Sequence, residues 1–145
     1  MKKWPDIAGE AGTATCIVVT ATWLKPDFNT AGLHPPGDLA YRCDRTDGRI
    51  GGGSLRLVAE HVTQAAITIL GTKNIQSTGY LLKQPHSAVA VVCTYCSPWS
   101  STEEDDQFMA HLRQVAGQAN RVLRLGDLNA PEVDWLTENP PPAAS

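Results

Sequence analysis

Two polar residues near the end of the chain, Asp127 and Asn129, have the types and spacing that phosphoryl chemistry needs. They follow residues 121–125, which we expect to form a strand, and they lie two positions apart. Because alternate residues of an extended segment point the same way, both side chains can face one pocket. An aspartate there can hold a hard cation or orient water, and an asparagine can donate to a phosphate oxygen. Gly, Asp and Asn are also common in turns, so residues 126–129 alone favour a tight turn.

Two other residue types could carry chemistry. Cys93 and Cys96 form a Cys-x-x-Cys pair, but an offset of three along a strand sends the side chains to opposite faces. No second pair at zinc-finger spacing occurs, so we predict buried structural thiols. The histidines are scattered and are interpreted as surface or capping residues: His34, His61, His86 and His111.

Residues 42–53 combine three arginines with three consecutive glycines. The glycines, 51–53, lack the Lys-Ser/Thr ending of a phosphate-binding loop and lead into a strand, which favours a backbone bend. Arg42, Arg45 and Arg49 have the chemistry to contact nucleic-acid phosphates. Asp44 and Asp47 lie among them and can pair with them instead. The sequence supports both interpretations equally.

The elements that position these residues are predicted to be mostly strands. Residues 15–20 are β-branched and apolar, which predicts a strand buried on both faces. A short strand is expected at 40–43. In residues 54–58, Leu55 and Leu57 alternate with polar Ser54 and Arg56, which is typical of a half-buried strand. Residues 65–70 and 87–95 are two more strands, and the second is apolar enough for the middle of a sheet.

One helix is expected between the strands at 87–95 and 121–125. Residues 100–102 offer hydroxyl N-caps, and the acids at 103–106 complement the positive end of the helix dipole. Apolar residues continue at helical spacing, and Gly117 is a plausible end. These apolar residues are Phe108, Met109, Leu112 and Val115.

Size and composition limit the function classes. A chain of 145 residues and 15.6 kDa is long enough for one domain with its own core. A net charge of -3 and a pI near 5.7 provide no overall positive field that would draw in nucleic acid. With no signal peptide and no apolar run of about 18 residues, we expect an intracellular, reduced protein without a membrane span. We expect residues 1–14 to be loosely ordered, 15–136 to form the domain and 137–145 to be a proline-rich tail.

Four blocks in order along the chain resemble the endonuclease/exonuclease/phosphatase superfamily, most closely the endonuclease region of non-LTR retrotransposon polyproteins. The last block is Gly-Asp-Leu-Asn at 126–129, followed by Asp134-Trp135. Residues 20–27, Thr-Ala-Thr-Trp-Leu-Lys-Pro-Asp, are similar to a Thr-Glu-Thr-Trp-Leu block. Residues 41–53 are similar to an Arg-x-Asp-Arg and glycine-rich segment, and 93–98 to a strand that ends in Tyr-Arg-Pro-Pro.

This resemblance implies an α/β fold, a four-layer α/β sandwich of the DNase I-like type, here truncated at both ends. It implies phosphodiester cleavage of DNA with Mg²⁺ or Mn²⁺. In the family, the residue matching Asp127 positions or activates water and contributes to metal binding. The residue matching Asn129 contacts the phosphate, and the residue matching Tyr95 supports the scissile group.

Two departures from the family pattern predict impaired catalysis. Ala21 stands where the family has its main metal-binding glutamate, and a methyl group cannot bind a cation. The closing Ser-Asp-His motif has no match in the sequence. The leading hypothesis is therefore a retrotransposon-derived endonuclease-type domain with impaired hydrolysis. The alternatives are a non-catalytic module that binds nucleic acid, or another chain through an unpaired sheet edge, and a relic without function.

Overall fold

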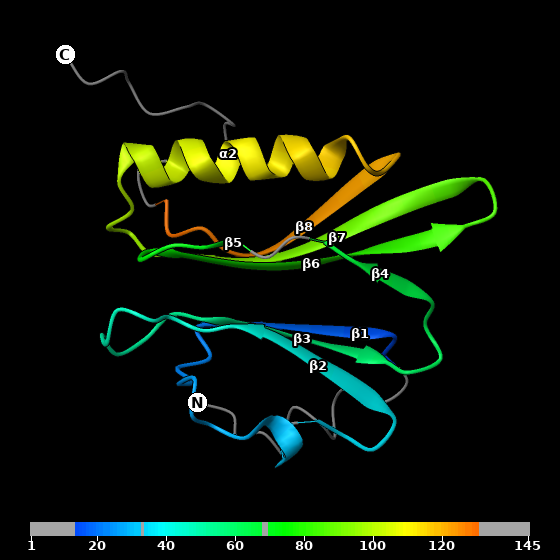
Figure 1. The fold of residues 1–145 in the computed structure, drawn as a ribbon, viewed down its shortest axis with the longest axis horizontal. Helices are drawn as coiled ribbons and strands as arrows, with labels where there is room; N and C mark the ends of the chain where they lie inside the picture. Colours follow the sequence, from blue (N-terminus) through cyan, green and yellow to red (C-terminus); the bar gives the residue numbers. More distant parts are fainter. Residues whose placement is uncertain (1–13, 33, 68–69, 131–145) are drawn as a thin grey trace.

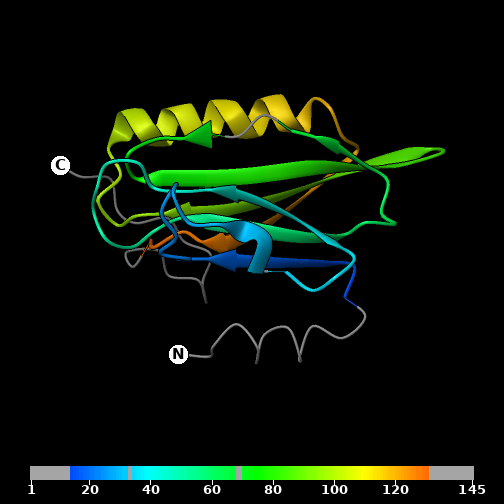
Figure 2. The same cartoon turned by 60° about the horizontal axis from the view of Figure 1, so that its bottom comes forward.

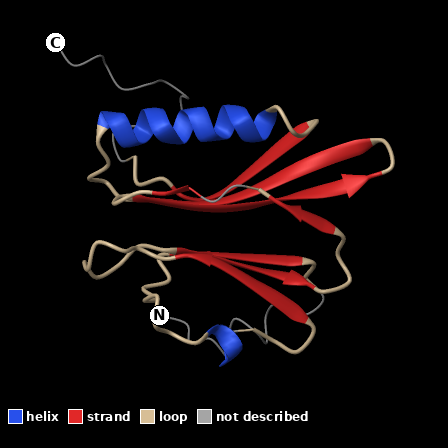
Figure 3. Cartoon of the chain, in the orientation of Figure 1, coloured by secondary structure: helices blue, strands red, loops and turns tan. Residues whose placement is uncertain are grey.

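The computed structural model of the chain describes residues 14–32, 34–67 and 70–130, in which two β-sheets lie face to face (Figure 1). Sheet A is antiparallel, with the strand order β1 (Cys16–Thr20), β3 (Ser54–Ala59), β2 (Asp38–Cys43). The helix α2 (Thr102–Ala116) covers the outer face of sheet B, and the short 3-10 helix η1 (Thr30–Gly32) lies beyond sheet A (Figure 3). The predicted α/β class is confirmed.

Sheet B has the strand order β4 (Gln64–Ala66), β6 (Ile75–Gln84), β7 (Ser87–Cys96), β8 (Arg121–Asp127). A further strand, β5 (Leu70–Gly71), also pairs with β6, so the single strand expected at 65–70 is wrong: two short strands lie there. The prediction that residues 87–95 form a mid-sheet strand is confirmed, because β7 lies between β6 and β8. No helix among the described residues is long and apolar enough to cross a membrane.

The helix α2 begins and ends where the sequence predicts. Ser101 is the N-cap: its hydroxyl accepts the Glu104 backbone N–H, and the Glu104 carboxylate accepts the Ser101 N–H, so that two helix-end donors are satisfied. Gly117 is the C-cap. Phe108 and Val115 are buried against sheet B, and each contributes about 1.5–3 kcal/mol through burial. Figure 2 shows the helix on the side of sheet B away from β1.

The helix also contains two departures from prediction. His111 is buried, so its interpretation as a surface or capping residue is wrong. It lies one turn from Phe108 and Val115 on the buried side of α2, and burial lowers its pKa, which favours the neutral imidazole. Met109, which was expected to continue the apolar stripe, is exposed.

The strand β3 is buried on both faces, so the half-buried strand predicted at 54–58 is wrong. β3 is the central strand of sheet A. Arg56 is only 2% exposed, and its guanidinium carbon lies 4.2 Å from the ring centroid of Tyr41 and 4.5 Å from that of Tyr80. Cation–π interactions with these two rings stabilise the buried guanidinium between the sheets.

The strand β1 is only partly buried, so the prediction of burial on both faces is also wrong. Within the described residues, β1 and β8 are edge strands of their sheets. They border an open groove of about 610 Å³ whose lining includes Cys16, Val18, Tyr80, Leu123 and Leu125. Both strands therefore present unpaired backbone groups and apolar side chains on one side of the sandwich.

Candidate functional site

The crossover from β7 through α2 to β8 brings two of the predicted site residues together. β7 and β8 are parallel, so their carboxyl ends meet at one edge of the sheet, at the left-hand end of the sandwich in Figure 1. In the register of sheet B, Asp127 lies beside Tyr95, and Tyr95 lies beside Gln76 of β6. Gln76, Tyr95 and Asp127 therefore form one row across three strands, with their side chains on the same face.

This row faces sheet A. The backbone N–H of Gly53 donates to the Gln76 side-chain oxygen over 3.1 Å, which ties the start of β3 to sheet B. A Cβ atom added at Gly52 would lie 2.8 Å from the Gln76 Oε1 and 3.2 Å from the Tyr95 Cε1. It would also lie 3.4 Å from the Cζ of Arg45, so three side chains converge on this glycine. Gly52 has φ +79, which favours glycine as well, and the predicted backbone bend at 51–53 is confirmed.

Asp127 and Asn129 are linked by a local turn. The Asn129 backbone N–H donates to the Asp127 Oδ1 over 3.1 Å, and Asn129 has φ +43, a conformation that asparagine tolerates. The Asn129 Nδ2 donates to the Cys96 carbonyl over 2.7 Å and joins the end of β8 to the end of β7. Asn129 lines a cavity of about 350 Å³ beside Ser97, Asp105 and Phe108, and Asp127 is outside that lining. Both the turn and a polar site are therefore compatible with this geometry.

The described residues do not form a preassembled metal site around Asp127. No group of three or more His, Cys, Asp and Glu side chains able to hold a metal ion occurs among them. Ala21 is exposed and has φ +51, and it presents only a methyl group at the position where the sequence resemblance predicts a metal-binding glutamate. Magnesium prefers several oxygen ligands in octahedral geometry, and one carboxylate that already accepts a backbone N–H provides few of them. The implied Mg²⁺ or Mn²⁺ does not fit this donor set.

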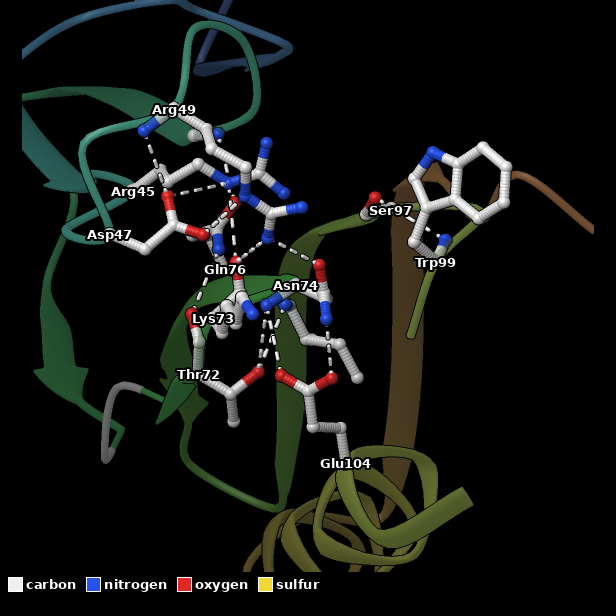
Figure 4. Close-up of polar contacts among 12 residues, drawn as sticks. Arg45, Asp47, Arg49, Thr72, Lys73, Asn74, Gln76, Ser97, Trp99 and Glu104 are labelled. Atoms are coloured by element: carbon white, nitrogen blue, oxygen red, sulfur yellow. Dashed lines mark hydrogen bonds and ion pairs between the residues drawn. The ribbon is translucent and has the colours of Figure 1, made fainter. Parts of the chain in front are cut away.

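The arginine segment forms the ion pairs that the sequence left open. Arg42 pairs with Asp44 over 3.1 Å. Asp47 accepts from Arg49 over 2.6 Å and lies 3.6 Å from Arg45. The Nε of Arg45 and the Nη2 of Arg49 both donate to the Lys73 carbonyl, so the two guanidinium groups meet there (Figure 4). Desolvation raises the pKa of Asp47, but the hydrogen bonds from Arg49 and the positive charges of Arg49 and Arg45 outweigh it and hold the pKa below its usual range.

The ion pairs leave Arg45 with an unused donor. Its side chain is only 7% exposed, and its Nη2 has no hydrogen-bond partner among the described residues. Arg45 also lines a cavity of about 290 Å³ whose other lining residues include Trp23, Lys25, Asp27 and Arg49. Ion pairing therefore uses only part of the hydrogen-bonding capacity of this segment.

Sequence reasoning missed the group that holds Arg49 in place. The Arg49 Nη2 donates to the Asn74 Oδ1 over 2.7 Å, and the Asn74 Nδ2 donates to the Glu104 Oε2 over 2.7 Å (Figure 4). The backbone N–H of Asn74 also donates to Glu104, over 2.9 Å. Desolvation raises the pKa of Glu104, but the hydrogen bonds, led by that from the Asn74 side chain, outweigh it and lower the pKa to about 2. No short motif joins residues 49, 74 and 104, so only the fold reveals the connection.

Sequence reasoning also missed two exposed tryptophans near this end of the sandwich. Trp23 is 59% exposed and lines the cavity beside Arg45 and Arg49. Trp99 is 77% exposed, and its backbone N–H donates to the Ser97 hydroxyl (Figure 4). Exposed indole faces are suited to stacking on planar groups, including nucleic-acid bases.

The cysteines take the structural role predicted for them. All four thiols are free, and Cys93 and Cys96 are buried. The Cys93 Sγ lies 3.9 Å from the carbonyl of Val19 in sheet A, whereas Cys96 packs with Phe108 of α2, so the two point to opposite faces. Burial raises the pKa of Cys93 to about 12 and that of Cys96 to about 11. Both thiols stay protonated near neutral pH and are poor nucleophiles.

Neither a model of a known protein family nor a curated protein matches this chain. The endonuclease resemblance therefore stays a prediction from the sequence blocks. Of these blocks, Asp134 and Trp135 lie outside the described residues, as do the proline-rich tail and all but the last residue of the loosely ordered segment expected at 1–14.

Proposed function

We propose that this chain is a phosphodiester-binding domain of the endonuclease type, with DNA as its ligand and with impaired metal-dependent hydrolysis. The observation that carries the proposal is the row of Gln76, Tyr95 and Asp127, which faces Arg45 across Gly52. A phosphodiester needs hydrogen-bond donors and a positive charge held in fixed positions. In this arrangement the Tyr95 hydroxyl can donate and Arg45 carries the positive charge. Gln76 is buried and bonded to Gly53 and Thr72, so it holds the glycine bend in place, and Asp127 can only accept. We also propose that the two sheets and the helix are part of a four-layer α/β sandwich of the DNase I-like type.

The impairment follows from the donors around Asp127. Position 21 carries a methyl group where the resemblance implies a carboxylate, and the described residues hold no metal-binding cluster. Asp127 can still accept a hydrogen bond from water, and the Tyr95 hydroxyl can still donate to a phosphate oxygen. Asn129 lines a different cavity, beside α2, and donates to the Cys96 carbonyl, so it supports the end of β8. Without a preassembled cation to offset charge on the phosphoryl oxygens, these groups support binding more than hydrolysis.

The test combines plasmid nicking with binding of a labelled DNA duplex, for the unmodified chain, Asp127→Ala and Ala21→Glu. Circular dichroism checks the fold of each. Ala21 already has a positive φ, so a glutamate there meets a backbone cost similar to that of alanine. We expect the unmodified chain to bind DNA and to nick in Mg²⁺ no faster than Asp127→Ala. Ala21→Glu is expected to gain Mg²⁺-dependent nicking.

Two results would contradict the proposal in different ways. Mg²⁺-dependent nicking by the unmodified chain that disappears in Asp127→Ala would show that hydrolysis is not impaired. A folded chain that neither binds the duplex nor gains nicking in Ala21→Glu would remove the nucleic-acid function.

A second candidate function, binding of another protein chain, is favoured by the groove between β1 and β8. Leu123 and Leu125 are exposed on an edge strand and line this groove of about 610 Å³. An unpaired edge with apolar side chains is a template for strand addition.

A further inference from the structure

We propose that the cavity lined by Trp23, Arg45 and Arg49 binds one nucleotide unit, with its phosphate on the arginines and its base against the Trp23 indole. This inference rests on the proposed function, because it names the part of a nucleic acid that the domain would hold beside Tyr95 and Asp127. The ligand chemistry is a phosphate attached to a planar ring. Three observations carry it: an unused buried donor, a strained exposed tryptophan, and a cavity of matching size.

The unused donor is the Nη2 of Arg45. The Arg45 side chain is only 7% exposed, and one of its guanidinium nitrogens has no hydrogen-bond partner among the described residues. This nitrogen has lost its contact with water and gained no bond in return, which costs free energy. Asp47 is shared by Arg45 and Arg49, so one carboxylate faces two cations. The pair therefore keeps about one positive charge, and the planar fork of a guanidinium suits phosphate oxygens.

Trp23 is held in a conformation that packing does not explain. It has φ +58, which costs a residue with a Cβ about 1 kcal/mol, yet its side chain is 59% exposed. The Trp23 backbone N–H donates to the Gly52 carbonyl over 3.0 Å, and the indole Nε1 would lie 3.8 Å from a Cβ at Gly51. The Trp23 backbone is thus tied to the glycine bend, and its indole lies beside that bend and the cavity. Backbone strain that gains no burial is typical of positions where a side chain is presented to a ligand.

The cavity has the size and charge for one nucleotide. Its volume of about 290 Å³ lies at the lower end of the range for small-molecule sites. Its lining includes three cationic residues, Lys25, Arg45 and Arg49, and one acidic residue, Asp27. Asp47 pairs with both arginines, so the balance around the cavity remains positive by about one charge. Arg45, which lines the cavity, and Tyr95 both approach Gly52, so a nucleic-acid strand held here would continue toward the Gln76–Tyr95–Asp127 row. The Asn74–Glu104 contacts hold Arg49 in position without a ligand.

The first test follows the Trp23 indole N–H by nuclear magnetic resonance, with the signal assigned from its loss in Trp23→Leu. Thymidine 5′-monophosphate is expected to shift this signal until the site is saturated. Thymidine alone and inorganic phosphate alone should each bind at least about tenfold more weakly than the nucleotide. Arg45→Gln should weaken binding of the nucleotide by about tenfold or more, since a hydrogen bond to a charged group is lost. The affinity of Arg45→Lys for the nucleotide should lie between that of the unmodified chain and that of Arg45→Gln, because lysine keeps the positive charge but lacks the planar guanidinium that binds two oxygens at once.

Matched controls use similar residue types outside the cavity. Phe28→Leu removes an exposed aromatic ring that is not part of the cavity lining, and Arg113→Gln removes an arginine from the last turn of α2. Neither should change nucleotide binding. If the nucleotide leaves the Trp23 signal unmoved, or if a folded Arg45→Gln binds it as well as the unmodified chain does, the site is wrong.

A short oligo-dT distinguishes the two sources of this chemistry. Tighter binding of the oligonucleotide than of the monophosphate identifies a nucleic-acid strand, and equal affinity identifies a free nucleotide; both support the site. If the chain responds to the nucleotide but does not bind the duplex, the proposed function is contradicted and the nucleotide site is not. Duplex binding without any nucleotide response would overturn the subsite alone.

Discussion

Two loops meet at the same end of the sandwich and differ in how they are held. The loop that follows β2 carries Arg45 and Arg49, and contacts tie it to Lys73, Asn74 and, through Asn74, to α2. The loop that follows β8 carries Asp127 and Asn129, and it is held by a local turn and one bond to the Cys96 carbonyl. The first loop is supported by the segment between β5 and β6 and, through it, by α2, whereas the second lies at the end of an exposed edge strand.

The loop that carries Arg45 and Arg49 is better suited to binding a ligand, and the loop that carries Asp127 is less suited to catalysing its hydrolysis. Groups that are fixed before a ligand arrives cost little to organise, so the arginine loop is prepared to hold an anion. Hydrolysis requires the same precision around Asp127, and there the described residues offer neither a second carboxylate at position 21 nor a supported strand edge.

Glu104→Ala should give the largest loss of stability, because it removes contacts that hold the loop carrying Arg45 and Arg49. It removes the acceptor for two Asn74 donors and for the N-cap N–H of Ser101, and Asn74 is buried. The expected loss is about 2–4 kcal/mol in the free energy of unfolding, measured by urea denaturation. Glu103→Ala, in the same helical turn, is the control and should change it by less than about 0.5 kcal/mol. Equal losses in the two variants would show that the Asn74–Glu104 contacts add no stability.

The same carboxylate predicts a dependence on pH. The pKa of Glu104 is lowered from 4.5 to about 2 in the folded chain. A lowered pKa means that the carboxylate stabilises the fold above pH 4.5, and that this contribution is lost as the pH falls toward 2. The stability difference between the unmodified chain and Glu104→Gln should therefore shrink over this range. A difference that stays constant down to pH 2 would contradict the lowered pKa.

The elements with strong local patterns were predictable from the sequence. The capping residues of α2 and the apolar run of β7 agree with the fold because local preference and tertiary packing favour the same structure there. The strand β6 was missed because Gln76, Ser77 and Thr78 suggest no buried strand, yet all three are buried. The hydroxyls of Ser77 and Thr94 lie 3.1 Å apart across the sheet, and such pairs become visible only when strands are placed side by side.

The candidate site was predictable in part for the same reason. Tyr95 and Asp127 lie at or just after the ends of strands predicted from the sequence, so their place at strand ends could be inferred, and the parallel register then makes them neighbours. The spare donor of Arg45 could not be inferred, because the sequence does not say which arginine each aspartate pairs with. Arg56 misled the strand prediction, since its partners are two aromatic rings and not water.

Leu123→Lys tests the unsupported side. Leu123 is exposed on β8 and lines the groove between β1 and β8. If the edge pairs with a second chain, sedimentation velocity should show association that rises with concentration, and a lysine on the edge should suppress it. Met109→Lys, at an exposed apolar position on α2, is the control and should leave association unchanged. A monomer at all concentrations would remove the edge as an interaction surface for copies of this chain.

Ala21→Gly should give the smallest effect and the opposite sign. Ala21 has φ +51, where a Cβ costs about 1 kcal/mol and glycine pays no such cost, although glycine also loses more entropy on folding. The net expectation is a gain of up to about 1 kcal/mol in the free energy of unfolding. Ala110→Gly, at an exposed position inside α2, should lose about 1 kcal/mol. Two losses of equal size would place residue 21 in an ordinary conformation. A gain at position 21 alone would show that the backbone keeps a strained turn there with no carboxylate to present.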